Sequence, residues 1–198
     1  MDIVIDAVNA NTTETAAVTD YFRTIARNLQ REAGVRRIAV VSIIGIDPFT
    51  AGHYAGKLAH EAAYREGPVP VRVLRAAQFH EFTEMMLDWT TRDDTAYVPR
   101  FRTQLVAARV AAEELATLAL ADEAADVVEL AGPEELNLAA SVAKLAARLG
   151  KPSRVEEIVD TEDPNHELQA AGALLPGPNA ILAGPTFDEW LDRKYPAR

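Results

Sequence analysis

The sequence predicts an α/β fold in which a parallel sheet is flanked by helices and is followed by a smaller C-terminal α+β region. Over residues 1–92, short apolar runs of strand length alternate with amphipathic helical segments. This alternation is typical of β-α-β units with right-handed crossovers. The runs are apolar at consecutive positions, as in strands that are buried on both faces. Elements become shorter in residues 93–198, where we expect one remaining core strand and the C-terminal region.

The first strand is expected over residues 2–8, almost at the start of the chain. A polar turn over residues 9–13 supplies residues that favour a helix N-cap. The helix that follows is predicted from Thr13 to Ala33, and Gly34 ends it. Its apolar residues recur every fourth position and form one stripe. The members of this stripe are Ala17, Tyr21, Ile25 and Leu29.

The later elements follow from the same periodicities. Further strands are expected over residues 35–44, 69–74, 95–99, 103–106, 127–130 and 154–159. Further helices are expected over residues 51–66, 78–90, 110–120, 136–149, 163–172 and 186–194. Residues 175–185 are rich in Pro and Gly and are expected to form a loop. Phe82, Met86 and Trp89 share one face of their helix and are expected to face the core.

Composition restricts the class of function. The formal net charge of −10, with no stripe of Lys and Arg, argues against nucleic-acid binding. The chain contains no cysteine, so thiol catalysis and zinc–thiolate sites are excluded. The longest apolar runs have strand length, and no basic segment precedes a long apolar run near Met1. We therefore expect a cytoplasmic protein that acts on a small-molecule substrate or ligand and does not bind a membrane.

Several segments, taken in order, carry a resemblance to a known family. They are Asp2-Ile-Val-Ile-Asp-Ala-Val-Asn9, Val40-Val-Ser-Ile-Ile-Gly45, Gly52-His-Tyr-Ala-Gly-Lys57-Leu-Ala-His-Glu61, Val71-Arg-Val-Leu-Arg75-Ala-Ala-Gln-Phe79 and Glu129-Leu-Ala-Gly-Pro133. Further segments of the set are Leu105-Val-Ala-Ala-Arg-Val-Ala111, Leu174-Leu-Pro-Gly-Pro178 and Gly184-Pro-Thr-Phe-Asp-Glu-Trp-Leu191. Together these ordered segments cover nearly the whole chain. The set resembles the NmrA-like, atypical branch of the short-chain dehydrogenases/reductases. The resemblance implies a Rossmann-like sheet and an oxidoreductase that uses NAD(P).

The resemblance also implies the site residues. The implied catalytic residues are Ser42, His53, Tyr54 and Lys57. The implied cofactor-binding residues are Asn9, Ser42, Lys57, Arg75 and Ala76. The implied residues of the substrate pocket are Gln78, Phe79 and His80. No spacing of metal ligands is found, so no metal site is expected.

Two departures from the family pattern bear on the chemistry. No two of the ten glycines are spaced as G-x-G, so the turn that accepts the pyrophosphate cannot be identified in this sequence. By resemblance, residues 1–92 correspond to a truncated Rossmann-like core, and the adenosine-side half of the NAD(P) site is missing. The family motif is Tyr-x-x-x-Lys, whereas here His53 lies four residues before Lys57 and Tyr54 lies three before it.

Three functions are left open by these departures. The first is an NAD(P)-dependent oxidoreductase whose cofactor site is incomplete or degenerate. The second is a cofactor-independent lyase, isomerase or cyclase that uses His53 and Tyr54 for acid–base chemistry. The third is a non-catalytic regulatory or sensor protein. The polar residues of this helix also have an interpretation that involves no function. His53 and Lys57 can be ordinary surface residues, and His60 and Glu61 can each form a surface hydrogen bond or ion pair.

The first strand carries a structural expectation of its own. In the family, this strand lies inside the sheet, but here its outer side would be an edge with free N–H and C=O groups. Such an edge favours pairing with another chain. We expect a homo-oligomer through residues 2–8, coverage by another chain segment, or a gene product that starts further upstream.

Overall fold

The computed structural model describes residues 2–32 and 34–196. The elements of the first part are β1 (Asp2–Asp6), α1 (Thr15–Arg31), β2 (Val35–Ile43), α2 (Gly52–Arg65), β3 (Val71–Ala76), α3 (Phe82–Thr90), β4 (Thr91–Arg92), β5 (Thr95–Pro99) and β6 (Arg102–Thr103). Those of the second part are α4 (Ala108–Leu120), β7 (Val127–Ala131), β8 (Leu136–Asn137), α5 (Leu138–Leu149), β9 (Arg154–Ile158), α6 (His166–Ala171), β10 (Ile181–Leu182) and α7 (Phe187–Lys194). The alternation predicted from the sequence is confirmed.

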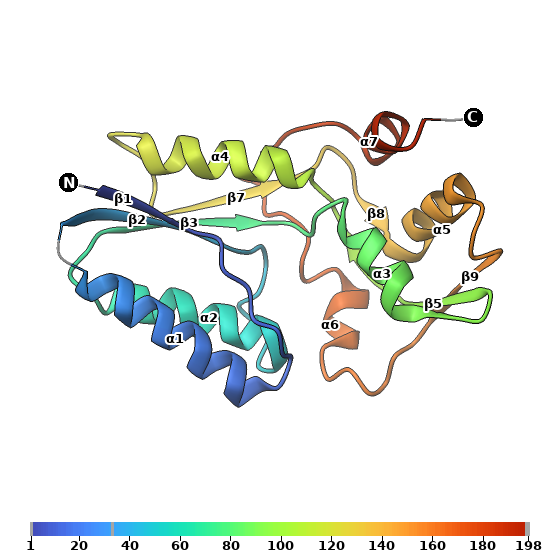
Figure 1. Cartoon of the computed structure of the whole chain (residues 1–198), viewed down its shortest axis with the longest axis horizontal. Helices are drawn as coiled ribbons and strands as arrows, with labels where there is room; N and C mark the ends of the chain where they lie inside the picture. Colours follow the sequence, from blue (N-terminus) through green and yellow to red (C-terminus); the bar gives the residue numbers. More distant parts are fainter. Residues whose placement is uncertain (1, 33, 197–198) are drawn as a thin grey trace.

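The main sheet is parallel and has the strand order β1-β2-β3-β7-β10. Helices α1 and α2 cover one face, and α4 covers the other (Figure 1). Successive side chains of each strand point to opposite faces of the sheet. In β2, Ile38 and Val40 pack with residues of α1 and α2, whereas Ala39 packs with residues of α4. The three layers explain why the strands of the sequence are apolar at consecutive positions.

The remaining elements form a second group at the carboxyl ends of the sheet strands (Figure 1). Strands β4, β5 and β9 form a small mixed sheet, and β6 pairs with β8. These strands and α3, α5 and α7 share an apolar core that includes Phe101, Leu138 and Phe187. Its junction with the main sheet is tight, because a Cβ atom at Gly45 would lie 2.1 Å from the carbonyl oxygen of Ala173. Gly45 also has a φ of +65°, which favours glycine.

Four details differ from the sequence-based expectations. The buried stripe of α1 lies one position after the expected one, because this is the face that packs on α2 and the sheet; its members are Val18, Phe22, Ala26 and Gln30. Ile181 and Leu182 form β10 beside β7, within the segment expected to be a loop, because the sheet edge supplies hydrogen-bond partners that the local sequence does not reveal. Trp89 was expected in the core but is 56% exposed, since it lies in the last turn of α3 and its ring packs edge to face on Phe82 at the surface. The side chain of Glu14, rather than the preceding polar turn, caps α1.

Strand β1 lies at one edge of the sheet and pairs with β2 alone among the strands that the structure describes. The side chain of Ile5 on this strand is exposed. Pairing of this edge with a second copy of the chain stays a prediction. None of the helices within residues 2–32 and 34–196 combines the length and apolar composition needed to cross a membrane.

The packing of α1 on α2 gives a testable prediction. A Cβ atom at Gly56 would lie 2.0 Å from Cγ1 of Val18 and 3.1 Å from Cδ2 of Phe22. We expect Gly56→Ala to lower the free energy of unfolding by about 1–3 kcal/mol, although alanine favours a helix by about 1 kcal/mol. Urea denaturation measures this change. Val18→Ala in the same chain makes room and should recover part of the loss, and a stabilised Gly56→Ala variant would contradict the close packing.

Candidate functional site

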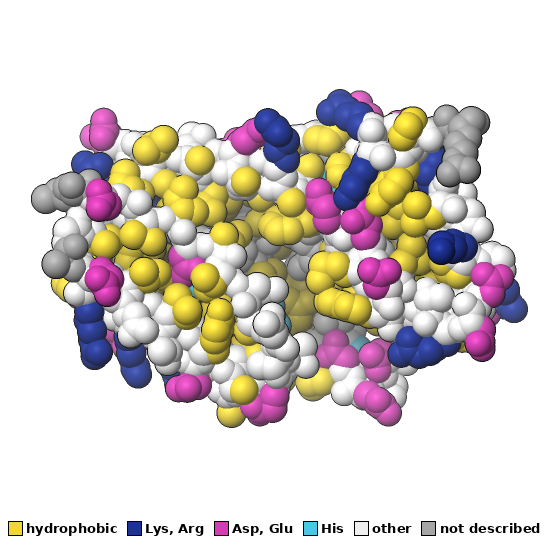
Figure 2. Space-filling model, in the orientation of Figure 1, with side chains coloured by type: hydrophobic (Ala, Val, Ile, Leu, Met, Phe, Trp, Pro, Cys, Tyr) yellow, Lys and Arg dark blue, Asp and Glu magenta, His cyan; other side chains and the backbone are white. Residues whose placement is uncertain are grey.

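The residues predicted for the site lie where the parallel strands end. β1, β2 and β3 finish side by side, and α2 crosses beneath their carboxyl ends (Figure 1). Ligand sites of open parallel sheets occur at this edge. Figure 2 shows the surface hollowed near its centre, between the part built on the main sheet and the part that contains α3 and α5. Hydrophobic side chains gather around this hollow.

Lys57 is buried and is held by backbone carbonyl groups and an aromatic ring. It is 5% exposed, and its Nζ donates to the carbonyl oxygens of Val8 at 3.1 Å and Val41 at 3.3 Å. The ammonium also lies 4.4 Å from the centre of the Phe22 ring. Burial lowers the pKa of Lys57 to about 8, although the carboxylates of Asp6 and Glu61 act in the opposite direction. An ammonium group has three N–H donors, so within the described residues these contacts leave one for a ligand.

His53 lies one helical turn before Lys57, as the spacing predicts. Its ring packs edge to face on Phe22, with ring centres 5.6 Å apart. Burial and, to a smaller extent, the positive charge of Lys57 together lower the pKa of His53 to about 4. His53 is therefore a neutral imidazole near pH 7, able to accept a proton.

The contacts of the Tyr54 side chain are with other residues than those that Lys57 contacts. Its ring packs on Phe49, with centres 4.5 Å apart, and its hydroxyl oxygen accepts a long hydrogen bond of 3.5 Å from Nε2 of Gln169 in α6. Burial raises the pKa of Tyr54, and the nearby Asp163 carboxylate adds to this effect. The hydroxyl group stays protonated over the ordinary pH range. A catalytic role for Tyr54 stays a prediction that these contacts do not favour.

Ser42 near the end of β2 is 3% exposed, and its Oγ has no hydrogen-bond partner within the described part of the chain. It lies two residues after Val40, so its side chain points to the same face of the sheet as α2. A buried hydroxyl without a partner is costly, which makes it a natural contact for a bound ligand.

A layer of buried polar side chains lies between α2 and the three strands. Asp6 of β1 is 3% exposed, and its Oδ2 accepts a hydrogen bond from the Tyr64 hydroxyl. Nε2 of His60 lies 3.0 Å from the same oxygen, although its N–H direction departs from the line of a good hydrogen bond. Burial opposes the charge of Asp6, but the contacts from His60, Tyr64 and the N–H of Val8 outweigh it and lower the pKa of Asp6.

The same layer continues to β3. Arg75 donates through Nε and Nη2 to the carboxylate of Glu61, at 3.0 and 2.9 Å, and its guanidinium also binds Asp47. Glu61 and His60 are each 1% exposed, so the surface alternative for them is wrong. The guanidinium of Arg75 is already engaged by two carboxylates, and a cofactor contact for it stays a prediction.

The other predicted residues lie around the same edge with different exposure. Asn9 is exposed, Ala76 is buried, and Phe79 is half-buried. The side-chain oxygen of Gln78 accepts a hydrogen bond from Thr103. His80 is fully buried and its Nε2 lies 3.2 Å from the carbonyl oxygen of Pro185, so it holds the chain before α7 rather than facing a pocket.

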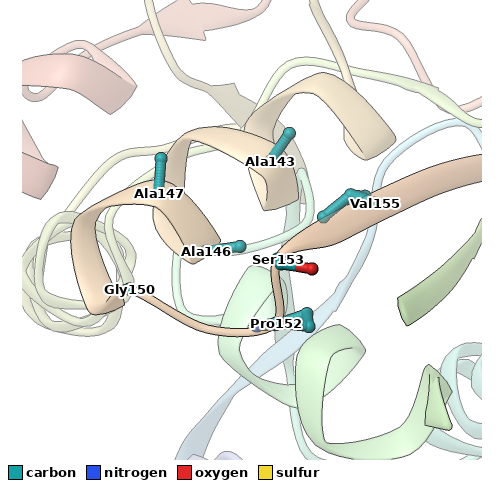
Figure 3. Close-up of a pocket in the computed structure, with 7 residues that line it drawn as sticks. All are labelled: Ala143, Ala146, Ala147, Gly150, Pro152, Ser153 and Val155. Carbon is teal, nitrogen blue, oxygen red and sulfur yellow. The ribbon is translucent and has the colours of Figure 1, made fainter. Parts of the chain in front are cut away.

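A separate pocket lies in the C-terminal part, between α5 and β9 (Figure 3). It has a volume of about 240 Å³ and is lined by small side chains: Ala143, Ala146, Ala147, Gly150, Pro152, Ser153 and Val155. None of the residues predicted for the site contributes to it, and it contains no charged group. Among the described residues, no group of three or more His, Asp and Glu side chains is arranged to hold a metal ion.

Comparison with known proteins bears on the fold. No protein-family model and no curated protein matches the sequence of this chain. Solved structures do match its fold. A nucleoside-diphosphate-sugar epimerase from Staphylococcus aureus aligns with a TM-score of 0.69 at 11% identity, over 96% of this chain and 76% of the epimerase. The chain has a Rossmann-like fold.

Two further structures agree with this assignment. The NADPH-dependent quinone oxidoreductase QOR2 from Escherichia coli aligns with a TM-score of 0.64 at 16% identity, over 98% of this chain and 74% of that protein. TunA, an NAD-dependent NDP-hexosamine 5,6-dehydratase of tunicamycin biosynthesis, aligns with a TM-score of 0.60 at 14% identity, over 99% of this chain and 71% of that enzyme. These are structures of short-chain dehydrogenase/reductase type, and at such identities the likeness concerns the fold.

Sequence reasoning missed Asp6 and Tyr64, which meet in the buried layer, and Phe22, which contacts Lys57, His53 and His60. One signal was available, because Asp6 interrupts a run of apolar residues of strand length. A carboxylate at such a position needs partners. The identity of those partners depends on how α2 lies on the sheet, which local sequence does not state.

The neutral state of His53 gives a prediction about pH. Its pKa is about 4 in the folded chain and 6.5 in an unfolded one, so the unfolded state binds more protons between these values. The contribution of the neutral His53 to the free energy of unfolding is therefore fully present above pH 6.5 and is lost as the pH falls toward 4. After allowance for partial exposure, we expect a loss on the order of 1–2 kcal/mol.

Urea denaturation at pH 7 and pH 4.5 measures the change. His53→Gln should flatten the pH dependence, because glutamine does not titrate. His166→Gln removes a histidine outside the buried layer and should leave the dependence in place. Equal slopes for the wild type and His53→Gln would show that His53 is not the group responsible.

Proposed function

We propose that the chain is an NAD(P)-linked oxidoreductase of the NmrA-like, short-chain dehydrogenase/reductase type, acting on a small molecule at the carboxyl edge of β1, β2 and β3. The observation that carries the proposal is the arrangement of α2. This helix places the ammonium of Lys57 against the carbonyl oxygens of Val8, in the turn after β1, and of Val41, near the carboxyl end of β2. The spare N–H of Lys57 and the unpartnered hydroxyl of Ser42 are then the polar groups left for a ligand.

These residues fit the nicotinamide and ribose end of a dinucleotide. Lys57 can donate to ribose hydroxyl groups, and Ser42 can bind the oxygen of a substrate carbonyl or alcohol. NAD(P), when bound, would supply or accept a hydride at the substrate carbon. The three similar solved structures include enzymes described as NADPH-dependent and NAD-dependent, which supports this choice of cofactor.

His53 is the residue that we assign to proton transfer. It stands where the Tyr-x-x-x-Lys motif has tyrosine, and its neutral imidazole can take a proton from a substrate hydroxyl. The positive charge of Lys57 opposes protonation of this ring, so the proton released in alcohol oxidation must pass onward to solvent. This chemistry favours alcohol oxidation, or proton abstraction, over reduction.

Acid–base chemistry without a cofactor is the second candidate, and the state of His53 favours it specifically. A neutral histidine beside a buried cation can move a proton in a lyase, isomerase or cyclase reaction. Tyr54 would then act only after its contact with Gln169 opens. This candidate predicts turnover that does not respond to added NAD(P).

Calorimetric titration with NADPH and NADH tests the cofactor. We expect a dissociation constant below about 1 mM, which corresponds to about 4 kcal/mol of binding free energy. Lys57→Met should weaken binding tenfold or more, about 1.4 kcal/mol, because it removes the donor to the ribose. Lys144→Met changes a lysine paired with Asp188 far along the chain and should bind as the wild type does. Absence of binding up to about 1 mM nucleotide would remove the first candidate for this chain.

A substitution at His53 tests the chemistry. His53→Tyr recreates the Tyr-x-x-x-Lys spacing and supplies a hydroxyl donor. We expect it to raise NADPH-dependent reduction of a panel of quinones and carbonyl compounds by about 100-fold, the usual scale of acid–base catalysis. His53→Phe is the matched control, since it has the ring without the hydroxyl. Equal rates for the two variants would show that position 53 does not face the reacting group.

A further inference from the structure

We propose that Asp6 is a positioning residue for Lys57, which it controls through the backbone of Val8. The proposal deepens the function proposed above, because Lys57 is the group assigned there to ligand binding. It concerns an aspartate that the family resemblance does not include in the site. The carboxylate of Asp6 holds the turn after β1 in the conformation in which the carbonyl oxygen of Val8 accepts a hydrogen bond from the ammonium of Lys57.

A continuous series of contacts supports this. Oδ1 of Asp6 accepts a hydrogen bond of 3.0 Å from the backbone N–H of Val8. The carbonyl oxygen of Val8 in turn accepts from Nζ of Lys57 at 3.1 Å. Val8 lies beyond the end of β1, so the sheet ladder does not set the direction of its peptide groups. The side chain of Asp6 provides the restraint that the ladder provides elsewhere.

Asp6 is itself fixed by the helix that carries Lys57. Its second oxygen accepts from the hydroxyl of Tyr64 and lies 3.0 Å from Nε2 of His60. Lys57, His60 and Tyr64 share one face of α2, at helical spacings of three and four residues. The contacts therefore close a ring that runs from α2 to Asp6, then to Val8, and back to α2 at Lys57. A shift of α2 along the sheet would break this ring.

The charges around Lys57 give Asp6 a second effect. The carboxylates that raise its pKa are Asp6, from β1, and Glu61, from α2 itself. Glu61 is already paired with Arg75 and Arg65. The partners of Asp6 are a tyrosine hydroxyl and a histidine, so less of its charge is cancelled. The other neighbours of Lys57 are the ring of Phe22 from α1 and the carbonyl group of Val41 from β2. On α2 itself, His53 lies one turn away from Lys57.

Nuclear magnetic resonance tests the coupling in the wild-type protein without any ligand. The chain has lysine at four positions, 57, 144, 151 and 194, so selective ¹³C labelling gives few signals, and Lys57→Arg assigns the one of interest. The backbone nitrogen of Asn9 reports on the Val8 carbonyl, and that of Ser42 reports on the Val41 carbonyl. Both should follow the titration of Lys57 near pH 8. An Asn9 signal that ignores this titration would overturn the proposal.

Asp6→Asn then separates positioning from simple packing. We expect the Lys57 midpoint to fall by about one pH unit or more, because a neighbouring anion is lost. The response of Asn9 should disappear, while that of Ser42 should persist, since β2 holds Val41 in place independently. Tyr64→Phe is the matched control, because it removes a donor to Asp6 but keeps both the charge and the bond to Val8.

The proposal is overturned if the Asp6→Asn protein folds and neither the titration midpoint of Lys57 nor the response of the Asn9 nitrogen to that titration changes. Asp6 would then have only a structural role. Equal shifts in Asp6→Asn and Tyr64→Phe would overturn the proposal as well. If Asp6→Asn does not fold, an Asn9 signal of the wild type that does not follow the titration of Lys57 still overturns the proposal, because the contact between Val8 and Lys57 would then be absent. Because no nucleotide is present, failure here leaves the proposed cofactor untouched, and failure to bind NAD(P) leaves this result untouched.

Discussion

The structure depends on the pairing of charged and polar groups buried between α2 and the carboxyl ends of β1, β2 and β3. A charge removed from water is tolerated only when partners compensate for it. Asp6, Glu61 and Lys57 each have such partners, and those partners come from different elements. This requirement fixes how α2 lies on the sheet more sharply than apolar packing does, because hydrogen bonds are directional and apolar contacts are not.

The chemistry of the candidate site follows from the same layer. A lysine surrounded by carbonyl oxygens and an aromatic ring keeps its charge at neutral pH but holds it less firmly than an exposed lysine does. The neighbouring histidine, packed on the same ring, stays neutral. Cation and base thus coexist one helical turn apart. This separation of charge states is what a proton-transfer site requires.

The C-terminal part contributes the other wall of the hollow. It has an apolar core of its own, and close backbone contacts at Gly45 and Gly132 join it to the sheet. At Gly132, a Cβ atom would lie 1.8 Å from the carbonyl oxygen of Leu105. The segment after the third strand runs from the sheet edge directly into this part.

The sequence alone determined the order and type of nearly all the elements, since the periodicity of apolar residues follows directly from backbone geometry. It also predicted Ser42, His53 and Lys57 as neighbours, because the end of the strand and the start of the helix are close along the chain. It left open whether the side chains of His60 and Glu61 are exposed. It did not reveal that Asp6 accepts a hydrogen bond from Tyr64, or that β10 pairs with β7. Those contacts join segments distant in sequence, so only the packing of α2 and of the sheet edge in three dimensions decided them.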